Sequence, residues 1–116
     1  MPYISTEKVK EIRVALKKAI PGYKLSVIRR HYNEVNVIVR EGKIDLKVSY
    51  EQVNEYYFKD HYKDKPELIL LISVILDTIQ NTFSQKEIVN DADYGSIPNY
   101  YIFLEIGEWN RPYLCN

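Results

Sequence analysis

Carboxylates near the end of the chain are the residues whose type and spacing could do chemistry. Asp91 and Asp93 lie two positions apart in a polar segment, and Glu105 and Glu108 follow them. Paired carboxylates can hold a divalent metal or act as general acid and base. Solvated loop carboxylates show the same pattern, and no Ser, Cys or Thr has a motif context for nucleophilic catalysis. We therefore assign no catalytic residue, no metal site and no cofactor.

A second group of side chains could bind anions. Cations on an opening helix and on the hairpin that follows it could track a phosphate backbone, with Ser26 and Asn36 as neutral donors. Two objections apply: a helix packed on the hairpin's apolar face would place the two basic sets on different sides, and solvated faces of small domains are commonly Lys-rich. The candidate nucleic-acid contacts are Lys10, Arg13, Lys17, Lys24, Arg30 and Arg40.

A third group is the aromatic stretch YYIFLEIGEWNRPY at residues 100–113. In one interpretation, which we favour for Trp109, its side chain folds back over the sheet edge and Pro112 stops further pairing. In the other, Trp109, Tyr101 and Arg111 form an exposed cluster of the residue types found at interface hot spots. The candidate protein contacts are Tyr94, Tyr101, Trp109 and Arg111.

Length and charge limit the classes of protein that need to be considered. The chain has 116 residues and a net charge of zero, which predicts a single domain over residues 1–116 and argues against a generic nucleic-acid binder. The charge is divided unevenly, since residues 1–47 hold eleven Lys/Arg against five Asp/Glu and residues 48–116 hold five against eleven. Such a division can give one basic and one acidic face, or the fold can intermix them.

Cysteine usage and hydropathy predict the compartment. The single cysteine, Cys115, cannot form an internal disulfide, which favours a reducing environment. Charges begin at Glu7, so no signal-peptide pattern is present. The longest apolar run, LILLISVIL, is about half of what a membrane span needs. We therefore expect a cytoplasmic protein without a membrane partner.

Periodicity predicts the elements that position these groups. Apolar residues at helical spacing predict a helix from Ser5 or Thr6 to Pro21, and alternation predicts a hairpin with Tyr23 and Val39 among the residues on its apolar face. The remaining predictions are a short strand at 43–48, a helix with a Ser-x-x-Gln capping box at 49–62, a buried helix from 66 to about 83, a loop at 84–99, a strand at 100–106 and a trailing tail.

Together these elements predict an α+β fold. The expected order is helix, β-hairpin, two helices and closing strand, with the helices on one face of a small antiparallel sheet. The closing strand is expected to join the hairpin, because an isolated two-stranded sheet is only marginally stable.

The order of motifs resembles the large polyvalent-protein-associated domains, small domains of phage and conjugative-element proteins. The resemblance rests on VKEIRVALKKAIPGYKLSV, VNVIV, YEQVNEYYF around Asn54, and the closing Ile-Gly-x-Trp-x-x-Pro-Tyr. It implies a context of mobile DNA entering a new cell, where some polyvalent proteins have been linked to countering host defence. It supplies no catalytic residue.

Three hypotheses follow. The first is a non-enzymatic accessory protein of a mobile element that binds a host or element-encoded protein. The second is a nucleic-acid-binding module, for DNA or RNA, that uses the basic helix and hairpin. The third is an enzyme that uses Asp91, Asp93 and Glu105.

Overall fold

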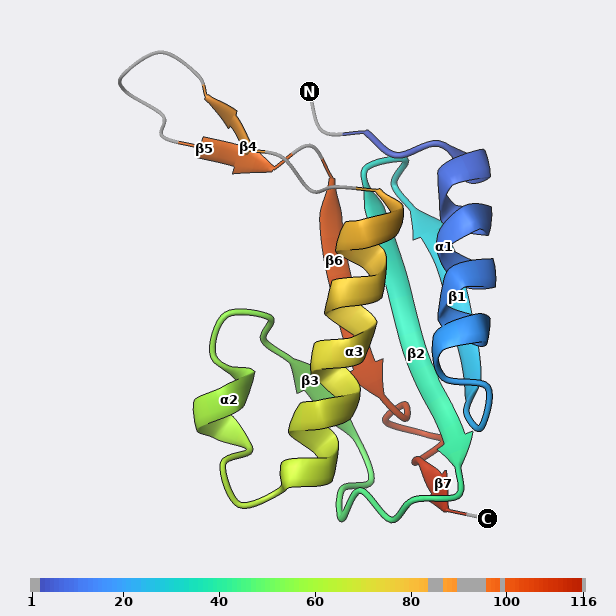
Figure 1. Cartoon of the computed structure of the whole chain (residues 1–116), viewed down its shortest axis with the longest axis vertical. Coiled ribbons are helices and arrows are strands. Elements are labelled where there is room, and N and C mark those ends of the chain that lie inside the picture. The colour runs from blue at the N-terminus through green and yellow to red at the C-terminus, as the bar shows by residue number, and fades with distance from the viewer. Residues whose placement is uncertain (1–2, 84–86, 90–95, 99, 116) are drawn as a thin grey trace.

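The protein has an α+β fold, described by a computed structural model over residues 3–83, 87–89, 96–98 and 100–115 (Figure 1). The elements are α1 (Thr6–Ala19), β1 (Lys24–Arg30), β2 (Glu34–Gly42), β3 (Glu51–Val53), α2 (Phe58–His61), α3 (Pro66–Thr82), β4 (Glu87–Val89), β5 (Ser96–Pro98), β6 (Tyr101–Ile106) and β7 (Leu114–Cys115).

The main sheet is mixed, which corrects the prediction of an antiparallel sheet. Its strand order is β1-β2-β6-β3, and β7 also pairs with β2. β1 with β2 and β3 with β6 are antiparallel, whereas β2 with β6 is parallel. The closing strand does join the hairpin, as predicted. It runs parallel to β2 because the chain returns through α3 before it enters β6, as parallel neighbours require.

Both long helices pack on one face of this sheet, as Figure 1 shows for α1 and α3. The apolar stripe of α3 is fully buried at Ile72 and Ile75, and that of α1 at Ile12 and Leu16. The inward-facing residues of the strands meet these helices in one core. They include Val27, Val35, Val37, Val39, Leu104 and Ile106.

Local signals explain where α1 and the hairpin begin and end. The Ser5 side chain accepts a hydrogen bond from the Lys8 backbone N–H, which caps α1. His31 and Tyr32 both have positive φ at the tip of the hairpin. Two such residues give the turn whose twist matches that of the flanking strands.

The predicted helix at 49–62 is wrong over most of its length. Glu51–Val53 is an edge strand paired with β6, and only Phe58–His61 is helical. The Asn54 side chain accepts hydrogen bonds from the backbone N–H groups of Tyr56 and Tyr57, and this turn diverts the chain. The predicted strand at 43–48 is also absent from the described chain, since Lys47 has positive φ and its N–H bonds to Asp45.

The C-terminal region is more regular than predicted. The expected loop contains the β4–β5 pair, and the expected tail forms a tight turn followed by β7. Gly107 has φ +69°, and a Cβ there would lie 2.3 Å from the Ser49 carbonyl oxygen and 2.6 Å from the Tyr113 nitrogen. The Tyr113 N–H donates to that carbonyl, so glycine allows the chain to close tightly here.

Within the described residues, none of the helices has the length and apolar character needed to span a membrane.

Candidate functional site

The face of the sheet opposite α1 and α3 is the main candidate site. We call it the open face, because none of the described helices lies on it (Figure 1). Strand register places its side chains in three rows across the sheet. The rows are Arg30, Glu34 and Tyr101; then Ile28, Asn36 and Phe103; then Ser26, Ile38, Glu105 and Gln52.

The middle of the open face carries large apolar side chains in contact with solvent. Phe103 is 53% exposed, and Ile28 and Tyr101 are each 39% exposed. Ile38 lies in the adjacent row, between Ser26 and Glu105, and is buried. Exposed apolar side chains scattered singly are ordinary, but a contiguous patch with polar residues around it marks an interaction surface.

Charge changes sign across the open face. β1 contributes the cations Lys24 and Arg30, β2 contributes Glu34 and Arg40, and β6 contributes Glu105. The face is therefore more basic along its β1 margin and more acidic toward β6 and β3.

Asn36 lies at the centre of the patch and is 2% exposed. Its Nδ2 donates a long hydrogen bond of 3.5 Å to Glu105 Oε1, and its Oδ1 is buried with no partner among the described residues. An unpaired buried acceptor costs free energy, so this position is not optimised for stability.

Trp109 lies at a tight turn just beyond β6, and its side chain is 81% exposed. The interpretation in which Trp109 covers the sheet edge is therefore wrong. Two backbone hydrogen bonds between Glu108 and Arg111 hold the turn, which leaves Trp109 and Asn110 at its tip. The predicted cluster with Tyr101 does not form, because Tyr101 begins β6 and Trp109 follows its end.

The structure divides the predicted basic set into separate groups. Arg13 donates from Nε and Nη2 to the Val27 carbonyl oxygen on edge strand β1, at 3.2 and 2.6 Å. Lys17, Lys24 and Arg40 line one hollow together. Arg30 lies at the other end of β1, roughly 20 Å from Lys24 at about 3.4 Å per residue.

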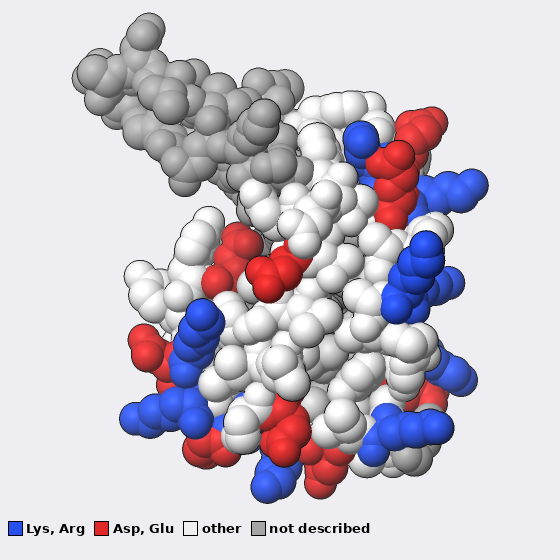
Figure 2. Space-filling model, in the orientation of Figure 1, with Lys and Arg blue, Asp and Glu red and all other residues white. Residues whose placement is uncertain are grey.

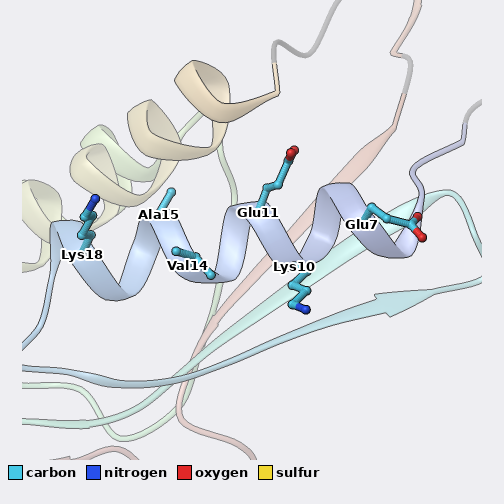
Figure 3. Close-up of a pocket in the computed structure, with 6 residues that line it drawn as sticks. All are labelled: Glu7, Lys10, Glu11, Val14, Ala15 and Lys18. Atoms are coloured by element: carbon cyan, nitrogen blue, oxygen red, sulfur yellow. The ribbon is translucent and has the colours of Figure 1, made fainter.

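Lys10 belongs to the outer surface of α1. A hollow of about 540 Å³ lies along this surface and is lined by Glu7, Lys10, Glu11, Val14, Ala15 and Lys18. All six come from one helix, and Figure 3 shows Lys10 and Glu11 pointing to opposite sides of it. None of the other described elements encloses a ligand there, so we assign no site to this surface.

Charges are mixed on the helical side as well. Figure 2 shows Lys and Arg along the margin formed by α1, with Asp and Glu among them and across the rest of the view. The uneven charge of the two halves of the sequence does not produce one basic and one acidic face on this side.

The predicted carboxylate chemistry finds little support in the described residues. Asp91, Asp93 and Tyr94 lie outside them, and Glu105 lies on the open face. Within the described ranges, no group of three or more His, Cys, Asp or Glu side chains could hold a metal ion.

A polar hollow of about 340 Å³ contains two other carboxylates, Glu55 and Asp77, together with Lys59. Burial raises the pKa of Glu55, while a hydrogen bond with Tyr56 opposes this shift. Acid–base catalysis by two carboxylates requires surroundings that separate their pKa values, so that one is protonated while the other is ionised. Ser73 also lines this hollow, and we assign it no catalytic role.

Sequence reasoning missed Phe103 and Ile28 as candidate contacts. The signal was present, because alternation placed Phe103 on the same face as Tyr101 and Ile28 on the face opposite Val27. Both are large apolar residues at positions that would be polar if that face were only solvated.

Compared with known proteins, the chain matches no family model, no curated protein and no solved structure. The resemblance to polyvalent-protein domains therefore stays a prediction that rests on the motifs themselves.

Proposed function

We propose that this chain is a non-enzymatic protein-binding module whose open face docks a host or mobile-element protein. The observation that carries the proposal is the uncovered apolar centre of that face, where Ile28, Tyr101 and Phe103 share two adjacent rows. A partner that buried them would gain about 25 cal/mol for each Å² of apolar surface removed from water.

A protein fits this face better than a nucleic acid does. Aromatic side chains on an open sheet can stack bases, but such sites also need a positive groove that follows the phosphates. In the three rows of the open face, the carboxylates Glu34 and Glu105 outnumber the one cation, Arg30. A strand of phosphates laid along β6 would meet carboxylates.

The charge layout also indicates what the partner surface carries. An apolar centre should face Phe103, an acidic residue should face Arg30 at the β1 margin, and a basic residue should face Glu105. Charge arranged in this way fixes orientation and speeds association more than it adds affinity.

The mobile-element context comes from the motif resemblance. Accessory proteins that enter a new cell with foreign DNA act on components of that cell, for which a binding face without catalytic groups is sufficient. A role in countering host defence belongs to the same proposal.

The test is affinity capture with paired surface variants. Tagged wild type, Phe103→Ser and Leu70→Ser are incubated with host-cell lysate, and bound proteins are quantified by mass spectrometry. Leu70 is a matched control, since it is an exposed apolar residue (66%) on α3, on the opposite side of the sheet. We expect a protein that wild type and Leu70→Ser retain equally and that Phe103→Ser loses at least tenfold.

Trp109 gives a direct readout with the purified partner, because it is the single tryptophan. Its emission should shift to the blue if the bound surface extends to the turn after β6. Equal capture by Phe103→Ser and wild type would contradict the proposal. A homodimer that Phe103→Ser dissociates would also contradict it, since the occupant would then be a second copy.

A further inference from the structure

A group of cations gathers at one end of the sheet, away from the apolar centre of the open face. We call it the basic end and define it by Lys17, Lys24, Arg40 and Arg111. Lys17, Lys24 and Arg40 line a hollow of about 450 Å³, and Arg40 and Arg111 line another of about 250 Å³. The two hollows share Arg40, so they adjoin each other.

These cations come from four separate segments. Lys17 is in the last turn of α1, Lys24 begins β1, Arg40 is in β2 and Arg111 is in the turn after β6. Only the tertiary fold brings them together. Convergence from distant segments differs from the ordinary solvated stripe of a helix, where neighbouring lysines follow from spacing alone.

Positive charge exceeds negative charge at the basic end. Glu41 lies 3.6 Å from Lys24, but the lysine side chain is 75% exposed, so this pair is weak. Glu108 pairs with Arg40. Lys17 and Arg111 form no ion pair with any carboxylate in the part of the chain that the structure describes. Four cations therefore face two carboxylates.

Arg40 is held in place between the hollows. Its Nε donates to Ser26 Oγ at 2.6 Å and its Nη1 pairs with Glu108, whereas Nη2 donates to no described residue. A guanidinium that is already fixed loses little conformational entropy when it binds an oxyanion. Its remaining donors are available for a phosphate oxygen.

We propose that the basic end binds the phosphate backbone of a nucleic acid, with adjacent phosphates in the two hollows. The four cations contact phosphate oxygens and no base edges, so binding does not depend on sequence. Lys10, Arg13 and Arg30 take no part, because they lie on the outer helix surface, on the β1 edge and at the far end of β1. This function is separate from protein docking on the open face.

The first arm of the test measures salt dependence. Fluorescence anisotropy with a labelled 12-nucleotide single strand and a 12-base-pair duplex is recorded from 25 to 200 mM salt. Two to four phosphate contacts give a slope of log K against log salt of roughly −1.5 to −3.5 across the two probes. Equal affinity for sequences of different composition is expected. A flat salt dependence, or no binding at 25 mM, would overturn the proposal.

The second arm uses charge-matched variants. Lys17→Gln and Arg111→Gln should each weaken binding about threefold to tenfold and lower the salt slope by about one. Lys10→Gln removes the same charge from the same helix as Lys17→Gln and should leave affinity within about twofold. Equal losses from Lys10→Gln and Lys17→Gln would show diffuse attraction to α1 and would contradict the site.

The third arm separates the two proposals and the source of the phosphate. Phe103→Ser should bind the oligonucleotides as wild type does, since the apolar patch is not used. Inorganic tripolyphosphate should compete only weakly, because its phosphates are joined by single oxygen atoms and lie closer together than adjacent phosphates of a nucleic-acid strand. Complete displacement at equimolar tripolyphosphate would assign the basic end to a small phosphate compound and overturn the nucleic-acid proposal.

Discussion

The two faces of one sheet differ in what covers them, although the same strands build both. On the inner face, Val37 and Leu104 are buried beneath α1 and α3. On the open face, Phe103 lies between Leu104 and Ile102 in sequence and is more than half exposed. Alternation along a strand lets one segment serve stability on one side and recognition on the other.

From this difference we expect substitutions on the inner face to affect folding and substitutions on the open face to affect binding. Each face keeps one buried polar atom without a partner among the described residues: Arg29 Nε on the inner face and Asn36 Oδ1 on the open face. Arg29 lies in edge strand β1 against the Tyr3 ring, whereas Asn36 lies in a central strand of the sheet. Proteins commonly retain such locally unfavourable residues at functional surfaces.

The largest expected effect is a direct test of this contrast. Ile72→Ala should lower the free energy of unfolding by about 2–5 kcal/mol, because Ile72 is fully buried and its truncation leaves a cavity. Phe103→Ser should change it by less than about 1 kcal/mol, as for most surface substitutions. Urea unfolding followed by circular dichroism measures both. Similar losses of unfolding free energy for the two variants would contradict the contrast between the inner face and the open face.

The turn after β6 should respond almost as strongly. Gly107→Ala should cost about 1–3 kcal/mol, because positive φ is strained for alanine and its Cβ meets backbone atoms of Ser49 and Tyr113. Thermal unfolding measures the loss. Gly22→Ala is the control, since nothing lies within 4 Å of a Cβ there; equal destabilisation by both variants would refute the role of the turn.

Alkaline pH should lower the free energy of unfolding through the buried side chain of Tyr100. Burial raises the pKa of Tyr100 from 10.0 to about 12, with a smaller contribution from Glu55. The folded state therefore holds this proton more tightly than the unfolded chain, so stability should be constant below pH 10 and fall as the pH rises from 10 to 12.

Tyr100→Phe tests the source of that loss. The Tyr100 hydroxyl donates to the Phe83 carbonyl oxygen at 2.5 Å, so the variant should lose about 1 kcal/mol at pH 8. Its stability should then fall less steeply between pH 10 and 12, with the remaining fall due partly to Tyr62, whose pKa is also raised to about 12. Urea titrations at pH 8 and pH 11 make the measurement, and parallel losses in both proteins would exclude Tyr100.

The smallest expected effect has the opposite sign. Asn36→Val should stabilise the fold by about 0.5–1 kcal/mol, because it removes an unpaired buried acceptor and places a β-branched residue in a central strand. Chemical denaturation measures the gain. A loss of stability would mean that Asn36 is satisfied in solution and would contradict this explanation.

Sequence patterns predicted most elements but not their pairing. The helical spacing in α1 and α3 and the alternation in β1, β2 and β6 were strong enough to give nearly correct boundaries. The 49–62 segment failed because a Ser-x-x-Gln capping pattern is a weak local preference. Pairing of Glu51–Val53 with β6 and the Asn54 turn outweigh it.

The candidate surfaces were predictable only in part. Trp109 and Arg111 were identified by residue type, but the exposure of Trp109 depends on a turn that closes through Gly107 and Tyr113. Lys17, Lys24 and Arg40 were identified as cations, but Arg111 joins them only because β6 lies beside β2.

The sequence by itself determined α1, α3, the hairpin and the alternating faces of the closing strand, because these follow from periodicity within a few consecutive residues. The tertiary structure decided the parallel pairing of β2 with β6, the short strands β3 and β7, and the gathering of cations at the basic end. These features depend on contacts between residues far apart in the chain, whose free energy no local pattern encodes.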